Sequence, residues 1–201
     1  MTNPPANIIA IVLAAGRASR FGGPQTKVLA PFEGEIMVRR AAKAALEAGL
    51  KTIVVCGYQA NLVRAALADL PVLTFENADY EAGLSTSLWA GLKAAGDADA
   101  ALILLADMPR VDAWLIGELC GAFVANPEVD AVVPVYKGVR GNPVVLARRV
   151  FARVEQLSGD QGARKLLSAS KAVMEIAIER DAVSFDVDTV DALAAEAKTT
   201  L

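Results

Sequence analysis

The stretch from Ile8 to Lys27 constrains the fold of this chain more than any other. It opens with seven apolar residues, of which four are β-branched, and this pattern is typical of a strand buried on both faces. A glycine-rich segment follows, and it carries the cations Arg17, Arg20 and Lys27. Such a loop after a buried strand is where α/β proteins hold phosphate, because glycines let backbone N–H groups approach the anion. The alternative is a tight strand-to-helix connection with solvated arginines, but that needs fewer glycines and cations.

Two familiar phosphate motifs do not fit this stretch. It matches neither G-x-G-x-x-G nor G-x-x-x-x-G-K-[ST], so a dinucleotide fingerprint and a P-loop are both poor interpretations. The stretch therefore predicts a phosphate-binding loop of another kind.

Composition limits the classes of function. The chain has 201 residues, of which 54% are hydrophobic. We therefore expect one domain over residues 1–201, with a core large enough to be stable without a structural metal or a disulfide. The net charge of −3 argues against a general binder of nucleic acid or membrane surfaces. There is no histidine, which excludes imidazole catalysis and histidine-ligated zinc.

Two further features point to a cytoplasmic protein. Cys56 and Cys120 are far apart in apolar surroundings, which is typical of free thiols in a reducing compartment. No uninterrupted apolar stretch reaches the ~20 residues of a membrane span, and residues 1–7 lack the features of a signal peptide.

The remaining chain alternates between predicted strands and predicted helices. The predicted strands cover residues 8–14, 52–56, 72–75, 100–106, 131–135, 143–146 and 173–178. The predicted helices cover residues 36–48, 61–70, 84–96, 113–124, 148–156, 163–170 and 190–198. The strand at 143–146 is expected to return from a hairpin-like polar loop. This alternation predicts a three-layer α/β domain with a mostly parallel central sheet.

Asp107 is the first candidate metal ligand. It follows a wholly apolar predicted strand, and ligands of open α/β sheets lie at the carboxyl ends of the strands. A carboxylate there is suited to holding Mg²⁺ against a phosphate. The alternative is an ordinary helix cap, but Asp112 is better placed for that role.

Asp186 and Asp188 are a second candidate set of metal ligands. In an extended segment their side chains lie on the same side, and two acids on one face favour a bound cation. A turn followed by a helix cap explains the same residues equally well.

Three polar segments could contact substrates. Ser85, Thr86 and Ser87 stand at a predicted helix start, where hydroxyls bind a ribose or phosphate or simply cap the helix, and the pattern alone favours the cap. The loops around Arg140 and Arg164 could hold a second, anionic substrate or serve as surface connections.

Taken in order, these motifs resemble those of the MobA-like nucleotidyltransferases, and most closely the molybdenum cofactor cytidylyltransferases. The matching segments run along nearly the whole chain: Leu13-Ala14-Ala15-Gly16, Arg20-Phe21-Gly22, Lys27, Gly57-Tyr58, Asn77 to Ser87, Asp107-Met108-Pro109, Gly141-Asn142-Pro143, Gly159 to Arg164, and Asp186 to Thr189. The resemblance implies a Rossmann-like fold and Mg²⁺-dependent transfer of a nucleoside monophosphate with release of pyrophosphate. Asn142 stands where many cytidylyltransferases carry histidine.

The resemblance also implies roles for individual residues. Leu13, Ala14, Ala15 and Gly16 would line the nucleotide, together with Ser85, Thr86 and Ser87. Arg20, Lys27 and Asp107 would be catalytic and would bind the triphosphate. Asp107 would hold Mg²⁺, with Asp186 or Asp188 as a second ligand, and Arg140, Asn142 and Arg164 would bind the acceptor.

The substrates expected from the resemblance are CTP and molybdopterin. Ala15 favours CTP, because the GTP-using relatives usually have Leu-Ala-Gly-Gly where this chain has Leu-Ala-Ala-Gly. The product, molybdopterin cytosine dinucleotide, would pass to a molybdenum hydroxylase as partner. Two alternatives stay open: a nucleotidyltransferase for another acceptor, such as a sugar or alcohol phosphate, and a non-catalytic chaperone that delivers the cofactor.

Overall fold

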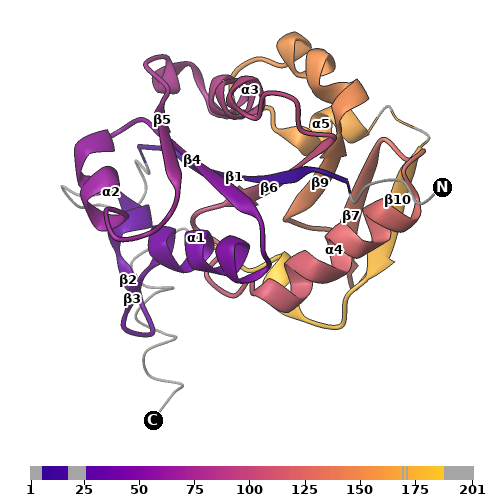
Figure 1. Cartoon of the computed structure of the whole chain (residues 1–201), viewed down its shortest axis with the longest axis horizontal. Helices are drawn as coiled ribbons and strands as arrows, with labels where there is room; N and C mark the ends of the chain where they lie inside the picture. Colours follow the sequence, from indigo (N-terminus) through magenta and orange to yellow (C-terminus); the bar gives the residue numbers. More distant parts are fainter. Residues whose placement is uncertain (1–5, 18–25, 169, 171, 188–201) are drawn as a thin grey trace.

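The structure is a computed structural model that describes residues 6–17, 26–168, 170 and 172–187. A mixed, mostly parallel sheet of eight strands forms its centre (Figure 1). The strands of this sheet are β1 (Ile8–Ala14), β4 (Lys51–Cys56), β5 (Leu73–Glu76), β6 (Ala100–Leu105), β7 (Ala131–Tyr136), β8 (Val139–Arg140), β9 (Val144–Ala147) and β10 (Val173–Ala177). Their order is β10-β7-β9-β6-β1-β4-β5, and β8 pairs with β7.

The strand predicted at residues 8–14 is confirmed, and it lies at the centre of the sheet. β1 pairs in parallel with β4 on one side and with β6 on the other. The three strands are apolar because both of their faces are covered by helices. Their carboxyl ends therefore lie together at one edge of the sheet.

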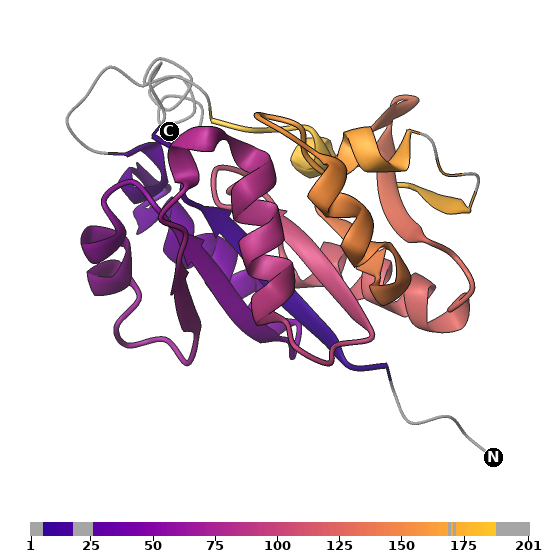
Figure 2. The same cartoon turned by 90° about the horizontal axis from the view of Figure 1, so that it is seen from above.

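The predicted three layers are also confirmed. Figure 1 shows α1 (Met37–Glu47) and α4 (Ala113–Ala125) on one side of the sheet and α3 (Leu84–Ala94) on the other. In Figure 2 α3 lies beside the segment that contains the 3₁₀ helix η3 (Arg148–Gln156) and α5 (Ala163–Leu167). Alternate β1 residues supply the two apolar cores, because successive side chains of a strand point to opposite faces.

Several predicted boundaries differ from the structure. The helix predicted at 61–70 is shorter, since α2 (Ala60–Ala66) ends in turns before β5. The helix predicted at 148–156 is a 3₁₀ helix, and the helix predicted at 163–170 ends at Leu167. The helix predicted at 190–198 lies outside the described residues.

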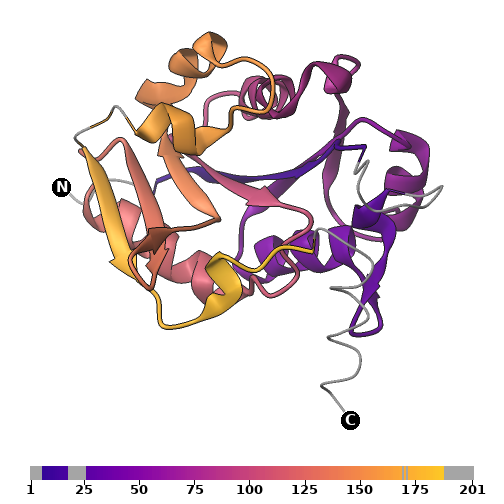
Figure 3. The same cartoon turned by 180° about the vertical axis from the view of Figure 1, so that it is seen from behind.

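β9 explains why the sheet is not wholly parallel. It returns along β7, as the hairpin-like loop predicts, but it also pairs with β6 and so lies between these two strands. Both pairings are antiparallel. The segment after β10 then runs back from the edge of the sheet toward its middle (Figure 3).

Small elements complete the edge at which the strands end. The hairpin of β2 (Pro31–Phe32) and β3 (Glu35–Ile36) forms a separate sheet, and the 3₁₀ helices η1 (Lys27–Leu29), η2 (Tyr80–Ala82) and η4 (Asp181–Val183) lie in loops. Asp112 caps α4, since its side chain accepts a 3.0 Å hydrogen bond from the Leu115 N–H, as predicted. In the described part of the chain, no helix is long and apolar enough to cross a membrane.

Candidate active site

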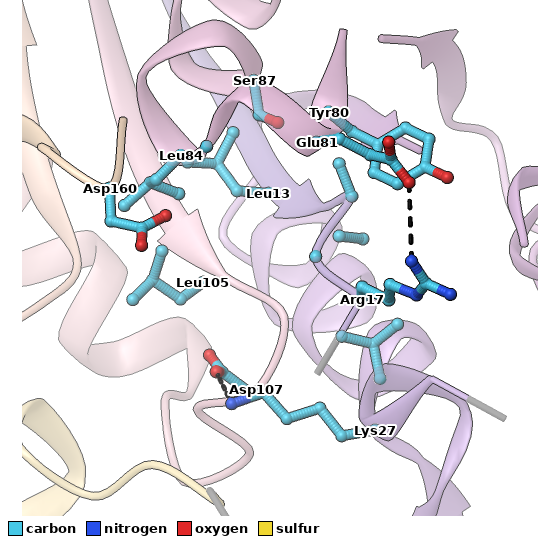
Figure 4. A pocket seen from close by; sticks show the side chains of 15 residues that line it. Leu13, Arg17, Lys27, Tyr80, Glu81, Leu84, Ser87, Leu105, Asp107 and Asp160 are labelled. Atoms are coloured by element: carbon cyan, nitrogen blue, oxygen red, sulfur yellow. Dashed lines mark ion pairs between the residues drawn. The ribbon is translucent and has the colours of Figure 1, made fainter. Parts of the chain in front are cut away.

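A cavity of about 650 Å³ opens at the carboxyl ends of β1 and β6 (Figure 4). Its position fits the general rule for ligands of open α/β sheets. The lining residues come from segments that are far apart in sequence: Leu13, Ala14, Ala15, Gly16, Arg17, Lys27, Val28, Tyr80, Glu81, Gly83, Leu84, Ser87, Leu105, Asp107 and Asp160. Seven of these were predicted site residues: Leu13, Ala14, Ala15, Gly16, Lys27, Ser87 and Asp107.

The loop after β1 is shaped by close backbone packing. The Ala15 carbonyl accepts a 3.1 Å hydrogen bond from the Tyr58 N–H. A Cβ atom added at Gly57 would lie 2.8 Å from the Ala15 methyl carbon, so glycine is needed there for the two loops to meet. Thr26 donates its hydroxyl hydrogen to the Gly16 carbonyl at 3.0 Å and so brings the two described ends of the loop together. Arg20 lies outside the described residues.

Lys27 and Asp107 form an ion pair on the cavity wall. The Lys27 Nζ atom lies 2.6 Å from Asp107 Oδ2, and the two side chains are only 16% and 18% exposed. Lys27 begins η1, and Asp107 follows β6, so the pair joins the segment after β1 to the end of the neighbouring strand. A cation and a carboxylate at this position are the groups that a metal-bound triphosphate requires.

The backbone that carries Asp107 is held from two sides. The Val187 N–H donates to the Asp107 carbonyl at 3.0 Å. The Arg40 Nε–H donates to the Pro109 carbonyl at 2.7 Å. The Arg40 guanidinium also lies 5.2 Å from the centre of the Phe32 ring, and Phe32 packs in one apolar cluster with Val187. These contacts restrict the movement of the loop after β6.

The residues present fit a divalent cation that is coordinated partly by the protein and partly by the phosphates of a nucleotide. Mg²⁺ is usually held by one or two carboxylates and by substrate phosphates, and the cavity offers the Asp107 carboxylate. Asp186 is exposed, adjoins Val187 in the chain and does not line the cavity, and Asp188 lies outside the described residues. Within residues 6–17, 26–168, 170 and 172–187, no three acidic or cysteine side chains form a metal-binding cluster.

The hydroxyl residues of α3 do not cap that helix, contrary to the interpretation that the pattern favours. The N-cap residue is Gly83, which has no side chain, and the Thr86 hydroxyl donates to the Gly83 carbonyl at 2.9 Å rather than accepting from a backbone N–H. Instead, the buried Asn77 side chain donates to the hydroxyls of Thr86 and Ser87 at 2.9 and 3.0 Å. Its oxygen accepts from the Asp79 N–H at 3.1 Å. Asn77 therefore ties the loop before α3 to the helix and aligns Ser87, which lines the cavity, whereas Thr86 does not.

The loop that carries Asp160 closes the cavity against the start of α3. The Ser85 N–H donates to the Gly159 carbonyl at 3.0 Å. A Cβ atom at Gly83 would lie 2.3 Å from the Gly159 carbonyl carbon, and Gly83 has φ +108, so only glycine suits this contact. Ser85 itself is buried and does not line the cavity.

The predicted acceptor-binding residues lie outside the described cavity lining. Arg140 pairs with Glu175 at 2.7 Å, and Arg164 donates to the Arg140 carbonyl. The Asn142 N–H donates to the Val183 carbonyl at 2.8 Å. In the structure these residues make contacts within the protein, and their acceptor role stays a prediction.

Arg17, one of the cations predicted in the loop after β1, lines the cavity, whereas sequence reasoning assigned no site role to Tyr80 or Glu81, which also line it. Arg17 lies 3.6 Å from Glu81, and its guanidinium is 5.4 Å from the centre of the Tyr58 ring. The Tyr58 and Tyr80 rings are 6.4 Å apart. Tyr80 and Glu81 stand in a polar segment with no strong local pattern, so only their contact with the loop after β1 reveals them.

The two cysteines do not supply a nucleophile at neutral pH. Both are free, as expected. Burial raises the pKa of the Cys56 thiol to about 11 and that of Cys120 to about 12, so both stay protonated.

Comparisons with known proteins agree with this geometry. A family model described as MobA-like NTP transferase domain matches residues 10–173. Nicotine blue oxidoreductase from Paenarthrobacter nicotinovorans is 29% identical over 195 residues, which cover 92% of this chain and 93% of that protein. Purine catabolism protein PucB from Bacillus subtilis (strain 168) is 28% identical over 174 residues, which cover 82% of each protein.

A solved structure extends the likeness to three dimensions. Rv0371c from Mycobacterium tuberculosis H37Rv has a TM-score of 0.81 and 28% identity, covering 96% of this chain and 98% of that chain. The same protein has also been solved in complex with manganese. Because the family match spans most of the chain, this protein belongs to the MobA-like NTP transferase domain family, a family of nucleotidyltransferases.

Proposed function

We propose that this chain is a Mg²⁺-dependent cytidylyltransferase that transfers CMP from CTP to molybdopterin. A phosphate oxygen of molybdopterin attacks the α-phosphorus of CTP. The bond from that phosphorus to the oxygen bridging to the β-phosphorus breaks, and pyrophosphate leaves with the bonding electron pair. The observation that carries the proposal is the Lys27–Asp107 pair, 2.6 Å apart, beside the backbone of Ala14 to Gly16 in a cavity of about 650 Å³.

The residues of the cavity supply positioning and charge. The Lys27 ammonium would neutralise charge on the triphosphate as the leaving group forms. Asp107 would hold the divalent cation, which when bound neutralises phosphate oxygens. The structure of Rv0371c in complex with manganese supports the use of a divalent metal. Neither a covalent nucleophile nor a histidine is needed, because phosphoryl-type transfer depends mainly on positioning and electrostatics.

Several finer assignments complete the proposal. Arg20 would hold the triphosphate with Lys27, and Asp188 or Asp186 would be a second metal ligand. Ala15 would favour cytosine over guanine. The protein would work in the cytoplasm and pass its product to a molybdenum hydroxylase.

The test is pyrophosphate release from CTP, GTP, ATP or UTP with Mg²⁺ and molybdopterin, or with a sugar or alcohol phosphate. We expect release with CTP and molybdopterin, together with the cytosine dinucleotide. Asp107→Asn should abolish turnover. Asp97→Asn is the matched control, because Asp97 is exposed near the other end of β6 and should retain the normal rate.

Each other outcome of this assay would indicate a different function. Release with a sugar or alcohol phosphate alone would replace the acceptor. Tight molybdopterin binding without turnover, unchanged in Asp107→Asn, would indicate a delivery chaperone. The relative named nicotine blue oxidoreductase suggests a further control: reduction of nicotine blue without pyrophosphate formation from any nucleotide would refute the transfer function.

A further inference from the structure

One side of the cavity carries an acid that has no basic partner in the described residues. Arg17 pairs with Glu81, and Lys27 pairs with Asp107. Asp160 lines the same cavity, but its side chain makes no hydrogen bond or ion pair within the described part of the chain. Figure 4 shows Asp160 on the side of the cavity away from Arg17 and Glu81. Asp160 is exposed where it lines the cavity, so its carboxylate is accessible to a ligand.

Three leucines line the same cavity as this carboxylate. Leu13 and Leu105 are register partners on the neighbouring strands β1 and β6. Leu84 begins α3, and its side chain packs against the Asp160 loop, because a Cβ atom at Gly162 would lie 2.9 Å from Leu84 Cδ2. All three leucines line the same cavity as Asp160 (Figure 4). We name them the leucine wall.

The chemistry of this side excludes phosphate and favours a flat ring. A carboxylate without a bound cation repels the triphosphate, whose charge would be matched instead by Lys27 and by a cation held at Asp107. An apolar wall binds the face of a heterocycle, and a carboxylate can accept two parallel N–H hydrogen bonds from its edge. The preferred ligand is therefore a ring with two adjacent N–H donors.

We propose that Asp160 and the leucine wall bind the heterocyclic ring of the acceptor through its amino group and the adjacent ring N–H. This donor edge belongs to 2-aminopyrimidin-4-one rings, which occur in pterins and in guanine. The inference rests on the proposed function, since molybdopterin carries a pterin-derived ring. Cytosine does not offer this edge, because a ring nitrogen acceptor stands beside its amino group. The site is thus assigned to the acceptor and not to the base of CTP.

The first test measures binding of free rings and needs no turnover. Pterin is compared with lumazine, in which an oxygen replaces the amino group, by quenching of their fluorescence. We expect the wild-type protein to bind pterin about tenfold more tightly than lumazine, because the amino hydrogen bond to a carboxylate is lost. Asp160→Asn should remove that difference. Glu155→Gln should retain it, because Glu155 is exposed on η3 and does not line the cavity.

A second measurement separates this inference from the proposed function. With CTP and molybdopterin, Asp160→Asn should raise the KM for molybdopterin about tenfold and leave the KM for CTP unchanged. Normal turnover in Asp160→Asn, with pterin still preferred over lumazine, would overturn the inference while the cytidylyltransferase stands. Pterin binding through Asp160 without pyrophosphate release would retain the ring site and refute the transfer function.

A comparison of guanosine with xanthosine tests whether the pair of N–H donors bound by Asp160 belongs to a pterin or to a nucleotide base. Guanosine and xanthosine differ at the same position as pterin and lumazine. If Asp160→Asn removed a preference for guanosine while the wild-type protein did not discriminate between the pteridines, the site would belong to a nucleotide base, and the assignment to the acceptor would be wrong.

Discussion

The Lys27–Asp107 pair makes a quantitative prediction about both stability and metal binding. Ion pairs on open surfaces contribute about 0–1 kcal/mol, whereas breaking a fully buried pair costs about 3–5 kcal/mol. With side chains 16% and 18% exposed, this pair lies between those limits. We therefore expect a coupling energy of about 1–3 kcal/mol between the two residues.

A double-mutant cycle measures this coupling. Lys27→Met, Asp107→Asn and the double variant would be unfolded in urea without nucleotide or metal. The cycle is needed because Lys27 makes further interactions, so a single variant would not isolate the pair. A coupling energy below about 0.5 kcal/mol would show that the two residues act independently.

The variants Lys27→Met and Asp107→Asn should change the affinity for Mn²⁺ in opposite directions. In the nucleotide-free protein Lys27 competes with a cation for Asp107, so Lys27→Met should tighten Mn²⁺ binding by about 5- to 150-fold, the equivalent of 1–3 kcal/mol. Asp107→Asn should abolish this binding. Calorimetric titration with Mn²⁺ measures both effects. Weaker binding in Lys27→Met would refute the assignment of Asp107 as the ligand.

Three further predictions concern positioning and stability. Arg40→Met removes the hydrogen bond to the loop after β6, so turnover should need several-fold more Mg²⁺. Arg39→Met, which loses an ion pair with the exposed Asp69 and a hydrogen bond to the Ala66 carbonyl, should not change the Mg²⁺ requirement. Gly91→Ala should lower the free energy of unfolding by about 1–3 kcal/mol in urea, because its Cβ would lie 2.4 Å from a β1 side chain. The hydrogen bond from Ser170 lowers the pKa of Asp130, and Arg149 and Arg153 lower it further against the opposing effect of burial. Its charged form therefore stabilises the fold above the unfolded pKa of about 4, and the stability lost in Asp130→Asn at pH 7 should disappear as the pH falls through the folded pKa.

Local sequence patterns were sufficient for the central elements. The apolar runs of β1 and β6 identify buried strands, since no polar side chain interrupts them. The loop after β1 and Asp107 after β6 could be placed at one edge of the sheet, because parallel strands end on the same side. The Lys27–Asp107 contact is a consequence of that arrangement.

Patterns failed where a structure depends on contacts between distant segments. β9 lies between β6 and β7 because of pairing on both sides, and no local signal encodes its second partner. The hydroxyls of α3 have the pattern of a helix cap, but Asn77 holds two of them. Tertiary hydrogen bonds outweighed a local preference in that case.

The sequence by itself determined the fold class, and it placed the glycine-rich loop after β1 and Asp107 after β6 at the carboxyl ends of buried strands. Only the tertiary structure decided which residues of the late loops reach the cavity. The contact between Gly83 and Gly159 brings Asp160 to the cavity, while Arg164 bonds to a backbone carbonyl outside its described lining. The physical reason is that side-chain direction in a loop depends on what the loop packs against, and the start of α3 supplies that contact from more than seventy residues away.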